Sequence, residues 1–263
     1  MEIRKQKEVE FHDKIRDGKL KGVPKEHKYL TSNRKFYSII RRSTGFVINY
    51  LTQNCLGKKT LDYCCGDGDT AILMAERGAG VAGVDISPVS IQNAKEKALK
   101  KGLKNIHFFV MDAEKLGFED EYFDLIACLG VLHHLDLKKA YPELARVLKI
   151  HGKIICNEPL IHNPVFQLYR RLTPHLRTKW KTEHILSRED IKLAEKYFGR
   201  VEKKFFHLTT LLTVPFRNMP IFGFILSICE TIDSILLKLP FIKWWAWQIV
   251  FILSEPKKQN GGT

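Results

Sequence analysis

The sequence predicts an α/β fold with a doubly wound, mostly parallel sheet of seven strands. Short apolar segments alternate with amphipathic helical segments along most of the chain, and this alternation is typical of sheets whose crossovers are helices. The expected strands span 59–64, 80–85, 105–110, 123–129, 152–158, 200–209 and 248–253, and the expected crossover helices span 69–77, 88–101 and about 136–149.

The helix boundaries carry their own signals. Ser87-Pro88 opens the helix at 88–101, because serine caps a helix N-terminus and proline fits its first turn. Asp136 opens the next crossover helix, and Gly152 follows its end. Ser187-x-x-Asp190 has the spacing of a capping box and starts a further helix.

The first 56 residues are expected to form a helical cap over the sheet. Residues 3–17 are polar and helix-prone, 18–24 contain helix-breaking glycine and proline, and 33–54 have the apolar spacing of an amphipathic helix. The segment 1–21 is charged throughout and lacks the apolar core of an export signal, so we expect a cytoplasmic protein.

Two regions depart from the alternating pattern. Residues 159–186 are basic and aromatic, and we interpret them as a lid that faces the substrate. Residues 211–245 are strongly apolar, but charged residues and prolines interrupt every window of the ~20 apolar residues that a transmembrane helix needs. The core would therefore comprise 57–210 and 246–254, with 211–245 as an apolar helical insertion.

The apolar insertion has three interpretations. Its basic residues and its tryptophans, Trp244 and Trp245, suit a membrane interface. A channel for an apolar substrate would have a similar composition, and so would packing against the core or against a second subunit.

Composition is typical of an enzyme-sized globular protein with excess positive charge. The 263 residues are 44% hydrophobic and 27% charged, enough to bury a core without disulfides or metal. The net charge is +14, from 43 Lys plus Arg against 29 Asp plus Glu. Nucleic acid and an anionic membrane surface both suit this charge, and so does solvation of the surface alone.

The six cysteines contain no C-x-x-C pair and no His–Cys spacing typical of zinc, so we expect reduced thiols. Cys64, Cys128 and Cys156 fall at the ends of three predicted strands, near one edge of the sheet. A site for a soft metal or metalloid substrate is one interpretation. Small buried apolar side chains are the favoured one.

A strand, a small-residue loop and a helix meet at 60–69. Small residues let a ligand approach the backbone, and the first turn of a helix presents free N–H groups. Asp85 ends the next strand, where one carboxylate can accept hydrogen bonds from both hydroxyls of a ribose. The G-x-G-x-x-G pattern of dinucleotide sites is missing, and Asp62, Asp67 and Asp69 would repel a pyrophosphate. We therefore expect a cationic nucleoside as ligand.

Four segments resemble class I S-adenosylmethionine-dependent methyltransferases in order and spacing. They are LDYCCGDGDTAILMAERGA, VAGVDISPVSIQNAKEKA, VMDAEKLGFEDEYFDLIACLGVLHHL and ARVLKIHGKIICNEP. They look most similar to the small-molecule branch, methyltransferase type 11, which is related to quinone-biosynthesis enzymes. The resemblance covers about residues 35–205 and implies S-adenosylmethionine as the cofactor. It also implies that the strand at 248–253 returns antiparallel at the edge of the sheet.

One position departs from the family pattern, acidic-x-Gly-x-Gly-x-Gly. Cys64 stands where the first glycine belongs. Because cysteine is small, we expect it to keep the turn with a negative φ and a slightly altered loop geometry, so that cofactor binding survives.

The resemblance assigns a role to each part of this edge. Asp62 and the backbone of 65–68 would hold the methionine part of the cofactor, and Asp85 with the apolar residue after it would hold ribose and adenine. Asp112 would accept a hydrogen bond from the adenine amino group, and a carbonyl after the fourth strand would take the ammonium group. The implied cofactor-binding residues are Asp62, Cys64, Cys65, Gly66, Gly68, Asp85, Ile86, Asp112, Ala113, Leu129 and Gly130.

Several histidines are candidates for a catalytic base. Methyl transfer is an in-line displacement, so the enzyme aligns the nucleophile and, for a hydroxyl acceptor, removes its proton. His133 and His134 follow the fourth strand at the rim of the site, and His162 and His184 border the lid. Glu158, at the end of the fifth strand, is a further candidate.

Family patterns narrow the chemistry further. Quinone-pathway relatives have acidic residues that can hold a metal where this chain has Gly130 and His133, so we predict no metal. Base-modifying N-methyltransferases carry an Asp/Asn-Pro-Pro-aromatic tetrapeptide after the fourth strand, but residues 127–130 are Ala-Cys-Leu-Gly. The segment 163–166, Asn-Pro-Val-Phe, follows the fifth strand and lacks the second proline. Nucleic acid is therefore a disfavoured partner.

The sequence favours methyl transfer to an apolar small molecule of lipid or isoprenoid type, with oxygen as the favoured acceptor atom. Peripheral contact with an anionic membrane is a further expectation. The alternatives are an RNA or protein methyltransferase, and a cofactor-binding module that has lost catalysis and uses its apolar insertion to dock a partner. The oligomeric state stays open.

Overall fold

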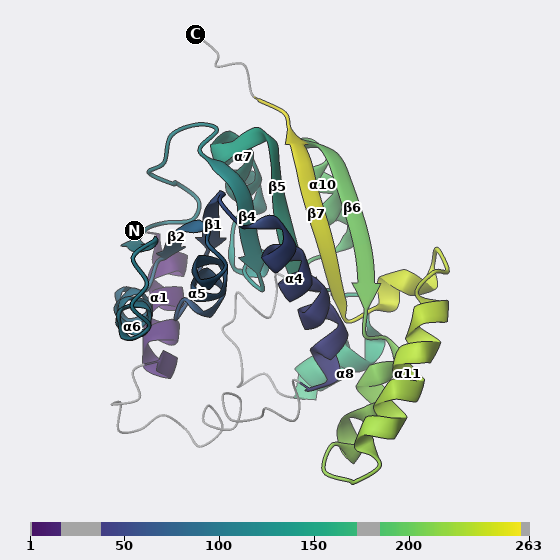
Figure 1. The fold of residues 1–263 in the computed structure, drawn as a ribbon. Helices are drawn as coiled ribbons and strands as arrows, with labels where there is room; N and C mark the ends of the chain where they lie inside the picture. The colour runs from purple at the N-terminus through teal and green to yellow at the C-terminus, as the bar shows by residue number, and fades with distance from the viewer. Residues whose placement is uncertain (1, 17–37, 173–184, 259–263) are drawn as a thin grey trace.

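The computed structural model describes residues 2–16, 38–172 and 185–258 (Figure 1). Its centre is a seven-stranded sheet in the order β3-β2-β1-β4-β5-β7-β6. Strands β1 to β5 run parallel. The predicted doubly wound, mostly parallel sheet is confirmed. The strands are β1 Lys59–Tyr63, β2 Gly80–Asp85, β3 Ile106–Val110, β4 Phe123–Leu129, β5 Leu148–Pro159, β6 Phe198–Phe206 and β7 Gln248–Pro256.

The position of β7 corrects one expectation. β7 runs antiparallel to both β5 and β6, so it lies inside the sheet, and β6 is the edge strand. The side chains of β7 are mostly buried, whereas most of those of β6 are exposed. A strand that is covered on both faces needs a continuous apolar run, and an edge strand tolerates the charged residues that β6 contains.

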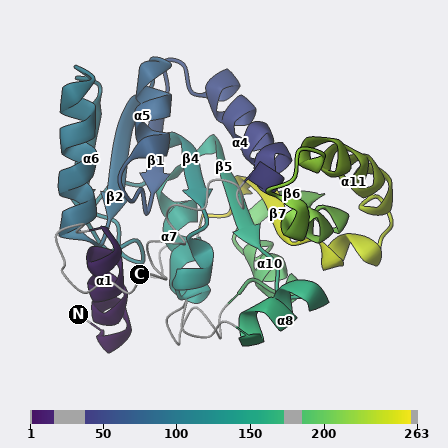
Figure 2. The ribbon, with the colours of Figure 1, turned by 90° about the horizontal axis from the view of Figure 1, so that it is seen from below.

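Helices cover both faces of the sheet (Figures 1 and 2). On one face lie α4 Arg41–Asn54, α5 Asp69–Glu76 and α6 Pro88–Lys100, and on the other lie α7 Leu137–Val147 and α10 Arg188–Ala194. The predicted caps are present: the Ser87 side chain accepts from the N–H of Ser90, Asp136 from that of Lys138, and Ser187 forms a capping box with Asp190. Each face buries its own apolar cluster.

The N-terminal segment contributes two separate helices. α1 Ile3–Arg16 packs against α6. The predicted helix at 33–54 appears as the 3-10 turn η1 Ser38–Ile40 followed by α4, and residues 33–37 lie outside the described part of the chain. α4 packs against β5, β7 and α5, so this part of the segment does cover the sheet.

The region after β5 is described only in part. A bridge joins Leu160 to Leu186, and α8 Pro164–Leu172 lies between them in sequence. Residues 173–184 of the expected lid lie outside the described residues.

The connection from β6 to β7, residues 207–247, is helical. It contains η4 Thr209–Phe216, α11 Phe222–Leu236 and η5 Ile242–Trp245, and it lies beside the β6–β7 end of the sheet (Figure 1). Arg41 of α4 holds α11 through an ion pair with Glu230 at 2.6 Å. Within the described ranges, no helix combines the length and apolar character needed to cross a membrane. Many large apolar side chains of this connection are exposed: Leu212, Phe216, Met219, Ile221, Phe224, Ile228, Ile232, Ile235, Leu239, Phe241 and Trp245.

Candidate active site

A cavity of about 410 Å³ opens at the carboxyl ends of β1, β2 and β4. This is the edge at which parallel α/β sheets bind ligands. Of the predicted cofactor residues, Asp62 in β1 and Gly68 at the start of α5 do not line the cavity. The others line it: Cys64, Cys65, Gly66, Asp85, Ile86, Asp112, Ala113, Leu129 and Gly130.

The loop between β1 and α5 is left-handed at three positions. Cys64 has φ 58°, Gly66 has 53° and Gly68 has 79°. The expectation of a negative φ at Cys64 is therefore wrong. The chain path requires the left-handed region here, and a cysteine adopts it only at the cost of contacts between its Cβ and the backbone.

Gly68 is required for space as well as for backbone conformation. It is the N-cap residue of α5, and a Cβ at this position would lie 2.8 Å from the Phe108 ring and 2.9 Å from the Cβ of Ala94. The third glycine of the motif therefore lets the start of α5 pack closely against β3 and α6.

Asp85 is held in one orientation by the backbone. Its Oδ2 accepts a hydrogen bond from the N–H of Gly66 and its Oδ1 accepts from the N–H of Ser87, each at 2.9 Å. A carboxylate oxygen has more than one acceptor position, so both oxygens retain capacity toward the cavity. The side chain is thus pre-oriented to bind two hydroxyl groups.

Asp62 supports the loop from below. Its Oδ2 accepts from the N–H of Ala71 in the first turn of α5, at 2.9 Å. Burial raises the pKa of Asp62 to about 7, and the nearby carboxylates of Asp85 and Asp69 act in the same direction. A cationic ligand in the cavity would stabilise the ionised form of this group.

The helix α1 completes the cavity, which the sequence did not indicate. Lys5 Nζ lies 2.6 Å from Asp112 Oδ2 and 2.7 Å from Glu114 Oε2, and Arg4 lies 2.5 Å from Glu114 Oε1. Arg4, Lys5 and Glu8 all line the cavity. The only sequence signal was their position on one face of a predicted helix. Asp112, the expected adenine ligand, is therefore already paired with α1.

Glu158 organises the turn after β4. Its carboxylate is fully buried, and Oε1 accepts from the N–H groups of Val131 and Leu132 at 2.7 and 2.8 Å. Oε2 lies 2.7 Å from Nδ1 of His133, which is itself buried. Burial raises the pKa of Glu158 to about 7, although its hydrogen bonds act in the opposite direction.

The four candidate histidines do not form one group. His134 lines the cavity, its Nδ1 lies 3.0 Å from Glu8 Oε2, and its ring centroid is 4.2 Å from that of His133. His162 is exposed, lies outside the cavity lining, and accepts from the N–H of Arg188 at 3.1 Å. His184 lies outside the described residues. Of the three candidates that the structure describes, His134 lines the cavity, and the buried His133 packs against it.

Comparisons with known proteins agree with this geometry. The family model described as a methyltransferase domain matches residues 56–205. The chain belongs to this methyltransferase family. It is a class I, S-adenosylmethionine-dependent enzyme, as the sequence predicted.

Several curated relatives carry methyltransferase names. Aklanonic acid methyltransferase DauC of a Streptomyces species is 30% identical over 151 residues, 52% of this chain and 69% of the relative. Ubiquinone biosynthesis O-methyltransferase of Idiomarina loihiensis is 39% identical over 112 residues, 42% of this chain and 45% of the relative. Apart from DauC, the chain spans about half the length of such curated relatives.

Solved structures share the fold. Geranyl diphosphate C-methyltransferase from Streptomyces coelicolor has a TM-score of 0.60 at 14% identity, over 96% of this chain and 98% of that one. The YcgJ protein from Bacillus subtilis has a TM-score of 0.53 at 21% identity, over 84% of this chain and all of that one. These likenesses concern the fold alone.

The residues of this methyltransferase fit its cofactor. The cavity presents a fixed carboxylate at Asp85, an apolar neighbour at Ile86, and the left-handed loop that follows β1. Asp62 offers a carboxyl group whose ionised form a nearby cation would stabilise. These groups match a ribose, an adenine and a cationic amino acid part.

Of the three cysteines at this edge of the sheet, Cys128 and Cys156 are packing groups, whereas Cys64 lines the cavity. Cys128 and Cys156 are fully buried in the core, and burial raises the pKa of the Cys64 and Cys128 thiols well above the usual range. Neutral thiols are poor ligands for metals. Within the described ranges, no group of three or more His, Cys, Asp or Glu side chains is placed to hold a metal ion. The absence of a metal stays a prediction.

Proposed function

We propose that this methyltransferase methylates a hydroxyl oxygen of an apolar small molecule. The observation that supports the proposal is the contact between the buried Glu158 and His133, whose ring centroid lies 4.2 Å from that of His134 in the cavity lining. S-adenosylmethionine supplies an electrophilic methyl group when it is bound. A hydroxyl acceptor must lose a proton in the same reaction, and an oriented histidine is suited to take it.

The contacts of the protein groups support a role for each. We propose that Asp85 holds the cofactor, that Asp62 acts on it from outside the cavity lining, and that the loop from Cys64 to Gly68 sets how deeply it enters. In this proposal Glu158 accepts a hydrogen bond from Nδ1–H of His133 and leaves Nε2 as the basic nitrogen. The aspartate of a catalytic triad fixes the tautomer of its histidine in the same way. We propose His133 as the base and His134, which lines the cavity, as the group that positions the acceptor.

An apolar acceptor is supported by two kinds of observation. Relatives are named for ubiquinone and menaquinone biosynthesis and for aklanonic acid. The β6–β7 connection exposes many apolar side chains, and we propose that it brings the enzyme to the surface of an anionic membrane where such substrates dissolve. We also propose residues 159–186 as the lid over the acceptor.

Labelled S-adenosylmethionine tests the proposed function. The protein is incubated with the label and a cell extract, and the lipid, aqueous, RNA and protein fractions are separated. We expect the label in the lipid fraction, and we expect its amount to fall in His133→Ala with cofactor affinity unchanged. Label in RNA or protein would support the alternative enzymes. Cofactor binding without S-adenosylhomocysteine production in any fraction would indicate a module that has lost catalysis.

A further inference from the structure

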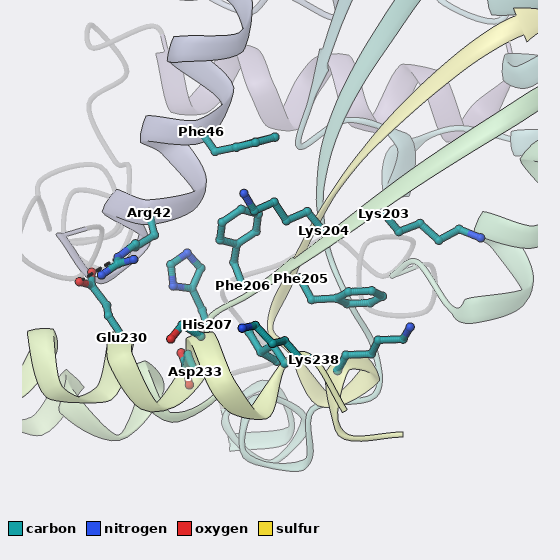
Figure 3. Close-up of a pocket in the computed structure, with 13 residues that line it drawn as sticks. Arg42, Phe46, Lys203, Lys204, Phe205, Phe206, His207, Glu230, Asp233 and Lys238 are labelled. Carbon is teal, nitrogen blue, oxygen red and sulfur yellow. Dashed lines mark hydrogen bonds and ion pairs between the residues drawn. The ribbon is translucent and has the colours of Figure 1, made fainter. Parts of the chain in front are cut away.

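A second cavity, of about 580 Å³, lies between α4, β6 and α11, and packing accounts for its charged side chains (Figure 3). Glu230 of α11 pairs with Arg42 of α4 at 3.1 Å. Asp233 accepts from two consecutive backbone N–H groups at the start of η4, at 3.0 and 2.7 Å. Lys204 Nζ lies 4.2 Å from the ring centroid of Phe46. These contacts tie α11 and the edge of the sheet to α4.

In the cofactor cavity, a buried acid of α1 forms part of the wall. Glu8 is only 7% exposed and lines this cavity, whereas Glu10 on the same helix is exposed. Burial of a carboxylate is unfavourable unless polar groups compensate for the lost water. Oε2 of Glu8 lies 3.0 Å from Nδ1 of His134, a histidine of the same cavity. This contact indicates what the buried carboxylate does.

Two residues of α1, one helical turn apart, hold His134 by its backbone and by its ring. The guanidinium of Arg4 donates to the carbonyl oxygen of His134 at 2.9 Å, and Glu8 contacts Nδ1 of its imidazole. Residues i and i+4 of a helix lie on the same face, so both side chains reach the turn after β4. α1 thus fixes where this histidine lies and how its ring is oriented.

The docking of α1 does not depend on Glu8. Lys5 Nζ lies 2.6 Å from Asp112 Oδ2 and 2.7 Å from Glu114 Oε2. Arg4 pairs with Glu114 at 2.5 Å, and α1 also packs against α6. These contacts hold the helix in place without the Glu8 carboxylate. A purely structural role of Glu8 would be redundant, and its specific consequence is the state of the imidazole.

The contact with Glu8 determines the tautomer of His134. An ionised carboxylate can only accept hydrogen bonds, so Nδ1 carries a proton and Nε2 has the acceptor lone pair. Glu158 contacts Nδ1 of His133 in the same way at 2.7 Å, and the two ring centroids lie 4.2 Å apart. The turn after β4 therefore carries two adjacent imidazoles, each with a carboxylate at Nδ1. One carboxylate comes from β5 and the other from α1.

We propose that Glu8 is a positioning residue of the active site. It holds His134 with Nδ1 protonated, so that Nε2 accepts a hydrogen bond from a donor group of the methyl acceptor. The N-terminal helix α1 thereby supplies part of the catalytic site as well as a wall of the cofactor cavity. The inference rests on the proposed function for the part that His134 plays toward the acceptor. The tautomer of the imidazole can be measured without an acceptor.

Nitrogen NMR of the whole protein with isotope-labelled histidine, in the presence of S-adenosylhomocysteine, reports the tautomer directly. The signals of His134 are assigned by their absence in His134→Gln. We expect a protonated Nδ1 in the wild type and in the control Glu10→Gln, which removes an exposed charge from the same helix. In Glu8→Gln the amide can donate to Nδ1, so the proton should move to Nε2. The same tautomer in the wild type and in Glu8→Gln would overturn the proposal.

A double-mutant cycle separates positioning from a structural role. Transfer of label from saturating S-adenosylmethionine to the extract fraction that accepts it is measured for the wild type, Glu8→Gln, His134→Ala and the double variant. We expect Glu8→Gln to lower transfer about tenfold and Glu10→Gln to leave it unchanged. The double variant should be no slower than His134→Ala, because Glu8 acts through this ring. Losses that multiply in the double variant would overturn the proposal.

The two measurements also distinguish this inference from the proposed function. If no extract fraction accepts the label, the proposed function falls, and the role of Glu8 toward an acceptor falls with it. If label is transferred but neither the tautomer nor the rate responds to Glu8→Gln, the inference is overturned and the proposed function stands. A shifted tautomer together with slower transfer and a non-additive cycle supports both.

Discussion

The Nδ1 atom of His133 lies 2.7 Å from Oε2 of Glu158, and the other oxygen of this carboxylate binds the backbone of the same turn. One buried side chain thus fixes both the path of the chain after β4 and the orientation of the imidazole. Residues separated by the whole of α7 form this contact.

Glu158→Gln should lower turnover by roughly 10²-fold or more, because the amide can donate to Nδ1 and leave the proton on Nε2 of His133. The glutamine oxygen can still accept from the turn N–H groups, so the melting temperature should change little. The pKa of Glu158 is raised to about 7, so wild-type turnover should rise with pH as this group ionises. A variant with wild-type turnover at every pH would contradict the role of Glu158 as a positioning residue.

Cofactor affinity should depend on pH through Asp62. Its pKa is about 7 in the free protein, so the group is mostly protonated at pH 6 and mostly ionised at pH 8. A cationic cofactor favours the ionised form, and affinity should increase by up to about tenfold over this range. Asp62→Asn should remove the dependence. Asp124→Asn, on β4 and paired with Lys149, is the control and should keep it.

The same group should influence stability in the opposite direction. The pKa of Asp62 rises from 3.8 to about 7 on folding. Between these pH values the folded, cofactor-free protein binds more protons than the unfolded chain, so the free energy of unfolding falls as pH increases through this window. Thermal melting of the cofactor-free protein should show that Asp62→Asn raises the melting temperature more at pH 8 than at pH 4. An equal shift at both values would contradict the assignment.

Cys64→Gly should stabilise the protein by about 1 kcal/mol, because glycine adopts the φ of 58° without a Cβ conflict while its greater freedom in the unfolded chain offsets part of the gain. Urea denaturation measures the change. Cys64→Ala keeps the Cβ and should give no gain. If the glycine variant were no more stable than the alanine variant, the loop would carry no strain at this position.

Membrane binding should depend on the exposed rim of the β6–β7 connection. Trp244 packs against Phe205 and is only partly exposed, so the exposed Phe241 and Trp245 are the better targets. Phe241→Ser/Trp245→Ser should release the protein from anionic vesicles, because these side chains enter the headgroup region. Leu56→Ser/Leu99→Ser removes two exposed apolar groups elsewhere on the surface, and this variant should remain bound. Equal sedimentation of both variants would assign the rim another role.

The sheet and most of the cofactor cavity were predictable because their signals are local. A strand, a glycine loop and a helix N-terminus are adjacent in sequence, and so are the caps at Ser87 and Asp136. The position of the last strand in the sheet was predicted wrongly. We placed β7 at the edge from the family resemblance, whereas the apolar run of β7 and the charged side chains of β6 are the local signal that β7 lies inside.

Contacts between distant segments were not predictable. Nothing in residues 1–16 indicates that Lys5 reaches Asp112, and no local pattern shows that Glu158 contacts His133. The positive φ at Cys64 was also missed. The path of the loop decides which φ this residue needs, and the small size of its side chain does not reveal that path. Tertiary packing decides such features.

Calorimetric titration of Asp85→Ala with S-adenosylmethionine tests whether this cavity is the cofactor site. We expect a loss of roughly 2–3 kcal/mol of binding free energy with the fold intact, because this carboxylate, held by the N–H groups of Gly66 and Ser87 at 2.9 Å, would accept hydrogen bonds from the ribose hydroxyls. Asp120→Ala, at an exposed acid that pairs with Arg146, should bind as the wild type does. Unchanged affinity in Asp85→Ala, with an unchanged circular dichroism spectrum, would contradict the assignment of this cavity as the cofactor site.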